Sequence, residues 1–207
     1  MILYVNGDSH SEGRGAGNKT FAQLIANHYN FTLQNQARGG ASNARILRTT
    51  EEFLKDNHPE LVVIGWSTWE REEWLYNDQY YDVNSSGHTG LPEELIDQYK
   101  QWVTQQSADE IDNKSRQLHE KIYQLHKVLE QRKISHIFFT CMYNFFSIKQ
   151  EYDWNNSFIN PYINASSYFW YLKNRGFQTD KWYHFGEDGH AAWGNFLINY
   201  IDKYKIL

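Results

Sequence analysis

The chain has 207 residues, a length that predicts a single domain spanning residues 1–207, and its formal net charge of −5 argues against a nucleic-acid-binding or anionic-membrane-binding surface. No run of about eighteen apolar residues occurs, so the sequence predicts no transmembrane segment. A strand pattern that begins at residue 2 predicts no signal peptide, and with it a cytoplasmic or virion-associated protein.

Two features of the composition bear on the chemistry. The single cysteine, Cys141, excludes an internal disulfide and argues against a zinc–cysteine site, and its apolar neighbours indicate a small core residue. Aromatic residues make up 17% of the chain, with 8 Trp and 15 Tyr, which is incompatible with disorder. We expect some rings to pack in the core and others to line a concave surface for a sugar-like or extended polar ligand.

The first third of the chain alternates between strand and helix patterns. Residues 61–65 form a continuous apolar run, which is typical of a strand buried on both faces. Residues 20–29 place apolar side chains on one helical face. The predicted elements are strands at residues 2–5, 31–36 and 61–65 and helices at residues 20–29 and 43–54.

Residues 66–111 interrupt this alternation. They are rich in tryptophan and tyrosine, and residues 93–103 have a helical pattern. Long irregular segments inside compact domains are typically functional or mobile. We therefore predict an aromatic-rich insertion that lies over the functional site.

The rest of the chain returns to the alternating pattern, and residues 112–131 form its clearest helical segment. The other predicted elements are a strand at 135–142, an aromatic and Asn-rich loop at 144–163, a helix at 166–174, a short strand at 177–179 and a helix at 188–204. Strands that alternate with helices predict a parallel sheet with right-handed crossovers, here a three-layer α/β/α domain of about five strands.

Polar stretches follow the predicted strands and precede the last helix. They occupy residues 7–11, 35–43, 65–68 and 180–190. Because the carboxyl ends of parallel strands meet at one edge of the sheet, we expect these stretches to lie together.

Serine-based acyl transfer needs a hydroxyl on a sharp turn, an imidazole base, a carboxylate that orients the base, and N–H donors for the oxyanion. The turn after the first strand offers the Ser9 hydroxyl, and the backbone N–H groups of Ser9 and Gly40 offer the donors. His184 and His190 are the candidate bases. The candidate orienting carboxylates are Asp180, Glu187 and Asp188.

These stretches resemble the sequence blocks of the SGNH/GDSL hydrolases, a family of esterases and lipases with a flavodoxin-like α/β/α fold. The first block, Gly-Asp-Ser, is matched by Gly7-Asp8-Ser9, and the resemblance implies that Ser9 is the nucleophile. The second block is matched by Asn35, Gly40 and Ser42, which implies that the Gly40 N–H binds the oxyanion.

The fifth block of the family is matched by the spacing of His184 and His190, which implies that His184 is the base and that His190 starts the last helix. The position three residues before His184 holds Lys181 where the family has Asp, and Asp180 lies one residue further back. Phe185 replaces the usual proline. We predict that a local bulge brings Asp180 to His184.

The third block departs further from the family. Ser67 stands where the family has an asparagine that donates to the oxyanion, and Asn43 is an alternative donor. Arg71 lies close behind and leaves an anion-binding role open. Asp8 and Asp188 are expected to cap the first turn and the last helix, respectively.

The resemblance implies a serine esterase that needs no cofactor and no metal. We predict hydrolysis of an O-acyl ester on a small polar or carbohydrate-like substrate by Ser9, His184 and Asp180. The alternative is a catalytically decayed module of the same fold that contacts carbohydrate or protein through its aromatic insertion. A two-metal phosphoesterase is disfavoured because its further Asp, His and Asn ligands are missing, and no nucleotide-binding glycine motif follows the first strand.

Overall fold

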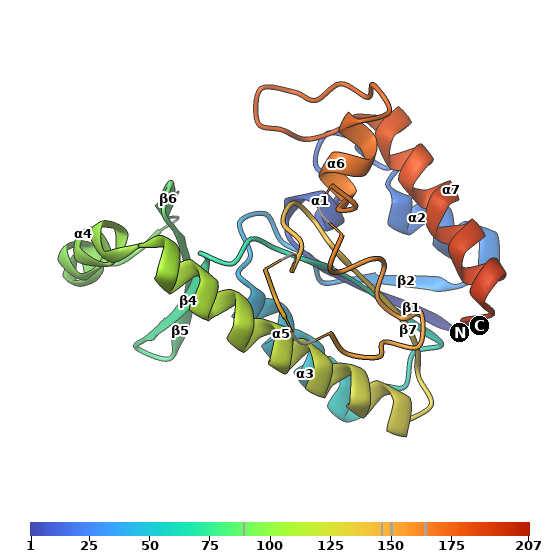
Figure 1. Cartoon of the computed structure of the whole chain (residues 1–207), viewed down its shortest axis with the longest axis horizontal. Helices are drawn as coiled ribbons and strands as arrows, with labels where there is room; N and C mark the ends of the chain where they lie inside the picture. The colour runs from blue at the N-terminus through green and yellow to red at the C-terminus, as the bar shows by residue number, and fades with distance from the viewer. Residues whose placement is uncertain (89, 146, 150, 164) are drawn as a thin grey trace.

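The computed structural model describes residues 1–207 apart from residues 89, 146, 150 and 164. At its centre is a four-stranded sheet in the order β2-β1-β3-β7, in which neighbouring strands are parallel. The strands are β1 (Ile2–Gly7), β2 (Thr32–Asn35), β3 (Leu61–Trp66) and β7 (Ser135–Thr140). A one-turn helix, α1 (Ser9–Glu12), begins directly after β1. The two termini lie side by side at the opposite end of the sheet (Figure 1).

Helices cover both faces of the sheet, which confirms the predicted three-layer α/β/α fold (Figure 1). One face carries α2 (Phe21–Tyr29), α6 (Tyr168–Lys173) and α7 (Glu187–Tyr204), and the other carries α3 (Asn43–Asp56) and α5 (Ala108–Gln131). Successive side chains of a strand point to opposite faces, so Leu3 and Val5 enter the first core and Tyr4 enters the second. Among the described helices, none is long and apolar enough to cross a membrane.

The predicted fifth strand is wrong. Residues 177–179 form only one isolated antiparallel bridge, to Phe185, because their backbone pairs with the returning chain of their own turn. The edge of the sheet beside β7 is lined instead by Phe158, which forms an isolated parallel bridge with Phe138. Phe158 belongs to the predicted loop at 144–163, in which residues 146 and 150 lie outside the described part of the chain.

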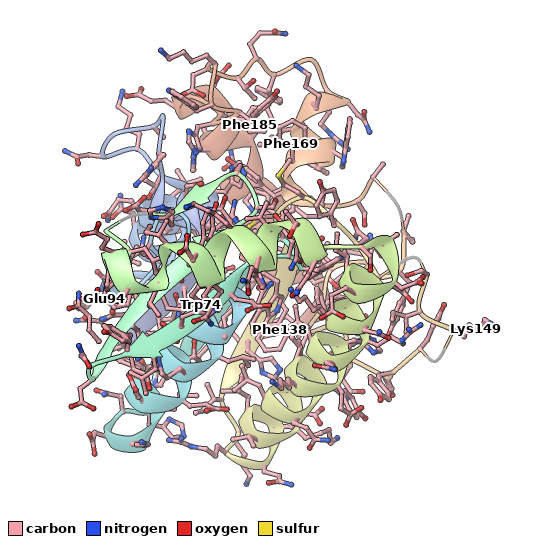
Figure 2. The ribbon with its side chains drawn as sticks, turned by 90° about the vertical axis from the view of Figure 1, so that its left-hand side faces the viewer. Trp74, Glu94, Phe138, Lys149, Phe169 and Phe185 are labelled. Atoms are coloured by element: carbon pink, nitrogen blue, oxygen red, sulfur yellow. The ribbon has the colours of Figure 1, made fainter. Side chains whose placement is uncertain are left out.

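The segment after β3 contains more regular structure than the sequence predicts. It holds an antiparallel sheet of β4 (Glu72–Tyr76), β5 (Gln79–Asn84) and β6 (Gly87–His88), then a 3₁₀ turn η1 (Glu93–Leu95) and α4 (Ile96–Gln105). The helix confirms the pattern at 93–103. Asn77 and Asp78 both have positive φ, 48° and 58°, as the two-residue turns of hairpins require. The ring of Trp74, which is labelled in Figure 2, lies 5.9 Å from that of Trp102, and this contact packs α4 against the hairpin.

Candidate active site

Ser9 is the first residue of α1, at the carboxyl end of β1. Asp8 caps this helix as the sequence predicts, because its Oδ1 accepts the N–H of His10 at 3.0 Å. α1 lies directly against the strand ends, since a Cβ on Gly65 would come within 2.4 Å of the Ser11 Oγ. The close packing that this glycine permits determines where the Ser9 side chain lies.

His184 lies in the turn between α6 and α7, and Asp180 closes that turn. The Asp180 N–H donates to the His184 carbonyl at 2.9 Å, and the Asp180 Oδ1 accepts the His184 N–H at 2.9 Å. Tyr183 adopts a left-handed φ of 67° inside the turn, and the Asp180 Oδ2 comes to 3.6 Å from the His184 Nδ1. The turn therefore accommodates the extra residue between acid and histidine. The N–H of His184 also lowers the pKa of the Asp180 carboxyl.

The glycine-rich loop after α1 lies against the turn that carries His184. Gly15 has a φ of +90°, and a Cβ there would lie 2.4 Å from the Phe185 carbonyl oxygen and 3.3 Å from the His184 Cβ. The ring of His10, which follows Ser9 in the chain, has its centre 5.6 Å from that of His184. Among the described residues no hydrogen bond joins the Ser9 hydroxyl to His184, a bond that in ligand-free sites often forms only with substrate.

The other candidate base, His190, is turned into the core. It is 0% exposed, stacks on Phe21 at 5.7 Å and accepts the Phe21 N–H at 3.4 Å, so it joins α7 to α2. Burial lowers the pKa of His190 to about 4. The predicted N-cap role of Asp188 is wrong, because α7 starts at Glu187 and Gly186 is its N-cap.

The two predicted backbone donors lie after β1 and β2. Gly40 has a φ of +80°, a conformation that glycine adopts at little cost. Within the described part of the chain, neither the Ser9 N–H nor the Gly40 N–H donates a hydrogen bond. Neither N–H group is therefore committed to an acceptor within the described residues.

The two predicted side-chain donors are already engaged. The Asn43 amide donates to the carbonyls of Ser67 and Thr68, both at 3.0 Å, and accepts the Ser67 N–H at 2.8 Å. The Ser67 hydroxyl donates to the Asp8 Oδ2 at 3.1 Å. Either side chain would have to break a hydrogen bond in order to bind an oxyanion. Asn43 holds the turn after β3 in shape.

Arg71 lies at the same edge of the sheet, and the sequence left only an anion-binding role open for it. Its Nη1 donates to the Ser67 Oγ at 2.9 Å and to the Ala41 carbonyl at 3.4 Å, and lies 3.5 Å from the Asp8 Oδ2. Arg71 therefore connects the turns that follow β1, β2 and β3. Burial alone would raise the pKa of the Asp8 carboxyl, but the neighbouring His10 and Arg71 outweigh it and lower that pKa.

A cavity of about 580 Å³ lies at the carboxyl ends of β3 and β7, against α5. Its lining includes Trp69, Glu70, Ile111, Ser115, Tyr143 and Asn144. Apolar walls with a few polar groups are typical of small-molecule sites. Within the described residues, no group of three or more His, Cys, Asp or Glu side chains could hold a metal ion.

No protein-family model and no curated protein matches the sequence. Among solved structures, a two-domain esterase (CEX) active on acetylated mannans, co-crystallised with mannopentaose, matches with a TM-score of 0.53 and 15% identity over 100% of this chain and 50% of that chain. TesA matches with a TM-score of 0.53 and 12% identity over 100% of both chains. The acetyl xylan esterase Est2A from the rumen bacterium Butyrivibrio proteoclasticus matches with a TM-score of 0.51 and 14% identity over 100% of this chain and 65% of that chain.

The likeness extends over the whole chain, which spans half of the two-domain esterase and the full length of TesA. At sequence identities of 12–15%, the similarity to these structures establishes the fold and nothing more. The parallel order β2-β1-β3-β7, with Ser9 directly after β1, agrees with the resemblance seen in the sequence. The chain has the fold of the SGNH/GDSL esterases.

Proposed function

We propose that this chain is a serine esterase in which Ser9 is the nucleophile, His184 the general base and Asp180 the carboxylate that orients it. The chief support is the 3.6 Å approach of Asp180 Oδ2 to His184 Nδ1, beside the helix that begins with Ser9. A carboxylate in that place selects the tautomer with a proton on Nδ1 and leaves Nε2 free to accept one.

The reaction proceeds through an acyl-enzyme. His184 Nε2 takes the proton of the Ser9 hydroxyl as Oγ attacks the ester carbonyl carbon. The tetrahedral oxyanion collapses, the bond to the alcohol oxygen breaks, and His184 returns the proton to the leaving alkoxide. Water then attacks the acyl-Ser9 ester by the same route and releases the acid.

The oxyanion is bound first by the N–H groups of Ser9 and Gly40. A side chain adds a third donor, and the candidates are Asn43 at the start of α3 and Ser67 and Arg71 in the turn after β3. Arg71 is favoured, because a guanidinium carries five N–H donors, whereas Ser67 and Asn43 donate their hydrogens to other groups. Its charge would also strengthen the contact with a developing anion.

The proposed substrate is an O-acyl ester of a polar or carbohydrate-like alcohol. The cavity beside Trp69 and Tyr143 is at the same edge of the sheet, although none of Ser9, His184 and Asp180 lines it. It offers aromatic side chains next to polar groups, which suits a sugar ring. Two proteins of like fold are esterases active on acetylated mannans and on acetyl xylan, which supports the same substrate class here.

Covalent labelling tests the proposal. A fluorophosphonate should add one adduct to the protein, located on Ser9 by peptide mass spectrometry, and Ser9→Ala should abolish it. The wild-type protein should also release acetate from acetylated xylo-oligosaccharides. Absence of both labelling and acetate release would contradict the esterase.

The labelling experiment also tests a second candidate function, that of a non-catalytic binding module. This candidate is favoured by the Ser67 hydroxyl, which donates to Asp8 at the position where the family has its oxyanion donor. A folded protein that resists the fluorophosphonate yet binds acetylated oligosaccharides would establish it.

A further inference from the structure

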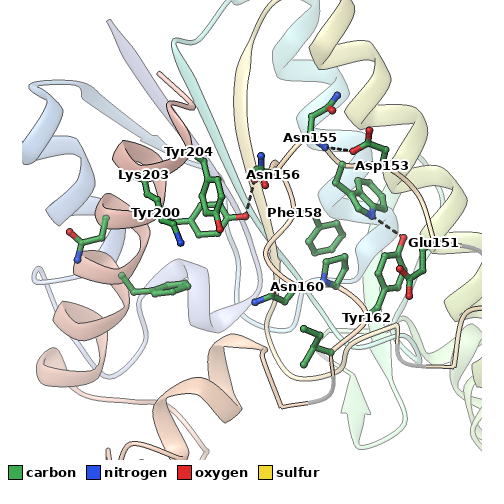
Figure 3. Close-up of a pocket in the computed structure, with 15 residues that line it drawn as sticks. Glu151, Asp153, Asn155, Asn156, Phe158, Asn160, Tyr162, Tyr200, Lys203 and Tyr204 are labelled. Atoms are coloured by element: carbon green, nitrogen blue, oxygen red, sulfur yellow. Dashed lines mark hydrogen bonds between the residues drawn. The ribbon is translucent and has the colours of Figure 1, made fainter.

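A second cavity, of about 570 Å³, lies between α7 and the segment 151–163 (Figure 3), and none of Ser9, His184 and Asp180 lines it. One wall is the carboxyl-terminal half of α7 with Tyr200 and Tyr204, and the other is the segment 151–163 with Asn156 and Asn160. Among the described residues it shares no lining residue with the cavity at the ends of β3 and β7. We call it the α7 groove.

The floor of the α7 groove is packed into the protein. Trp154 and Phe158 form it and are 5% and 3% exposed. The Tyr162 hydroxyl accepts the Trp154 Nε1–H at 2.9 Å (Figure 3). It also accepts the Tyr152 N–H at 2.7 Å, and the two bonds hold the Trp154 and Tyr162 rings in position. A surface built in this way loses little conformational entropy when a ligand binds.

The two walls are held at a defined separation. The Tyr200 hydroxyl donates to the Asn156 carbonyl at 3.0 Å and so ties α7 to the loop (Figure 3). Asn155, Asn156 and Asn160 all have positive φ, at 47°, 62° and 40°. Asparagine adopts this conformation more readily than most other non-glycine residues, so these three positions suit the tight turns of the segment.

Three side-chain amides of the groove lack partners inside the protein. Asn156, Asn160 and Asn199 are exposed, and within the described chain their side chains make no hydrogen bond. A carboxamide both donates and accepts, as a sugar hydroxyl does. Tyr204 beside them is 38% exposed and offers ring surface to the apolar C–H face of a sugar.

The charges of the groove argue against anionic ligands. The lining holds two acidic residues, Glu151 and Asp153, and one basic residue, Lys203. It therefore has no excess of positive charge that would bind a phosphate or a nucleic acid. Exposed amides on the walls also suit a lipid tail poorly. Together with the exposed amides, these features favour a neutral ligand with many hydroxyls.

We propose that the α7 groove is a non-catalytic binding site for a neutral glycan chain. Its value to the protein rests on the proposed function: a chain held there would retain an acylated polymer near the enzyme while Ser9 acts on its ester groups. The binding itself requires no catalysis, so the two proposals can fail separately.

Titration of the Ser9→Ala protein with unacylated xylohexaose and mannohexaose, followed by amide NMR shifts, tests the groove. We expect the largest shifts in residues 151–163 and in the second half of α7. Tyr204→Ala and Asn199→Ala should each raise the dissociation constant about fivefold, since each removes one aromatic or hydrogen-bonding contact. Shifts confined to the Ser9 edge, or no shifts at all, would overturn the proposal.

Tyr80→Ala is the matched control, because Tyr80 on β5 is 41% exposed, close to the 38% of Tyr204. It should leave the dissociation constant unchanged, and an equal loss in both variants would refute a specific site. In the protein that retains Ser9, Tyr204→Ala should slow the release of acetate from an acetylated polymer. It should not slow the release of acetate from p-nitrophenyl acetate. If the wild-type protein has no esterase activity but binds glycan in the groove, the proposed esterase is refuted and the proposed binding site is supported.

Discussion

Arg71 brings a full positive charge to a place where the resemblance to the SGNH/GDSL hydrolases leads one to expect a neutral amide. Its contact with the Asp8 carboxylate matters, because a buried charge left without its partner is strongly destabilising. Arg71 thus has two roles that mutation has to separate: it neutralises Asp8, and in our proposal it binds the oxyanion.

Arg71→Lys separates these roles. Lysine keeps the charge beside Asp8 but lacks the planar set of donors, so the thermal midpoint should change little. We expect kcat to fall about tenfold to a hundredfold at a nearly constant KM, because the lost bond forms mainly in the transition state.

Ser67→Ala and Asn43→Ala are the comparison variants for the third donor, measured with the same ester. If Ser67→Ala shows the larger loss of kcat, the hydroxyl is the donor and Arg71 acts only on Asp8. If Arg71→Lys, Ser67→Ala and Asn43→Ala are all active at the wild-type rate, the two backbone donors suffice.

His184 and His190 make a second contrast at the residue scale. His184→Ala should reduce kcat/KM by several orders of magnitude, as Ser9→Ala should, and the double variant should be no worse, because members of a catalytic triad act as a unit. His190→Ala should instead lower the free energy of unfolding by about 2 kcal/mol or more while the remaining folded protein stays active, since it empties a buried site. A dead but stable His190→Ala protein would contradict this assignment.

At the scale of elements, short glycine-rich turns set the position of the site. Gly65 lets α1 lie on the strand ends, and Gly15 lets the loop after α1 reach the turn of His184 and Phe185. The first contact is to Ser11, and the second is to the Phe185 carbonyl and the His184 Cβ. We therefore expect both to influence how far the Ser9 hydroxyl lies from the His184 imidazole.

Gly15→Ala tests this at the loop, with Gly17→Ala as control. Both positions have positive φ, at 90° and 55°, but a Cβ on Gly15 would meet the Phe185 carbonyl at 2.4 Å, whereas nothing lies within 4 Å of a Cβ on Gly17. Gly17→Ala should cost about 1 kcal/mol of stability, the backbone effect alone. Gly15→Ala should cost about 2 kcal/mol more and lower kcat, because His184 must move. Equal behaviour of the two variants in urea unfolding and in kcat would refute the role of this contact.

At the scale of the whole molecule, buried histidines couple stability to pH. Burial lowers the pKa of His136 and of His190 to about 4. The His136 Nε2 lies 2.8 Å from the His126 Nδ1 between α5 and β7. These rings remain neutral in the folded protein under conditions in which the unfolded chain takes up protons.

The sign of the pH effect follows from the lowered pKa. Above the ordinary value of 6.5 the rings are neutral in both states, and between pH 6.5 and about 4 only the unfolded chain binds protons, so the free energy of unfolding falls as the pH falls. Each such histidine contributes up to about 1.4 kcal/mol per pH unit. His136→Gln should flatten the slope of stability between pH 6.5 and 4.5 in urea unfolding. His28→Gln, on the exposed side of α2, should not change it.

The pattern of apolar residues was sufficient to predict most of the helices and strands. The runs at residues 2–5 and 61–65 and the helical spacing at 112–131 predict their elements, because a continuous apolar strand is stable only between two layers of helices. The hairpin of β4 and β5 escaped prediction because its strands are only partly buried and show no strict alternation. The strand predicted at 177–179 failed because a run of three residues pairs more readily within its own turn than with the distant sheet.

What the sequence by itself determined is the order of the elements and the residues from which a site could be built, including Ser9, Gly40, His184 and Asp180. Their catalytic roles remain predictions. The spacing already led us to predict a bulge that brings Asp180 to His184, and the structure has the two side chains 3.6 Å apart. The tertiary structure alone decided that His190 is buried and that Arg71 reaches Asp8 and Ser67. The physical reason is that local patterns record which side chains are buried, whereas the direction of a side chain at the end of a strand depends on the backbone path of the loop after it and on the glycines that let other segments come close.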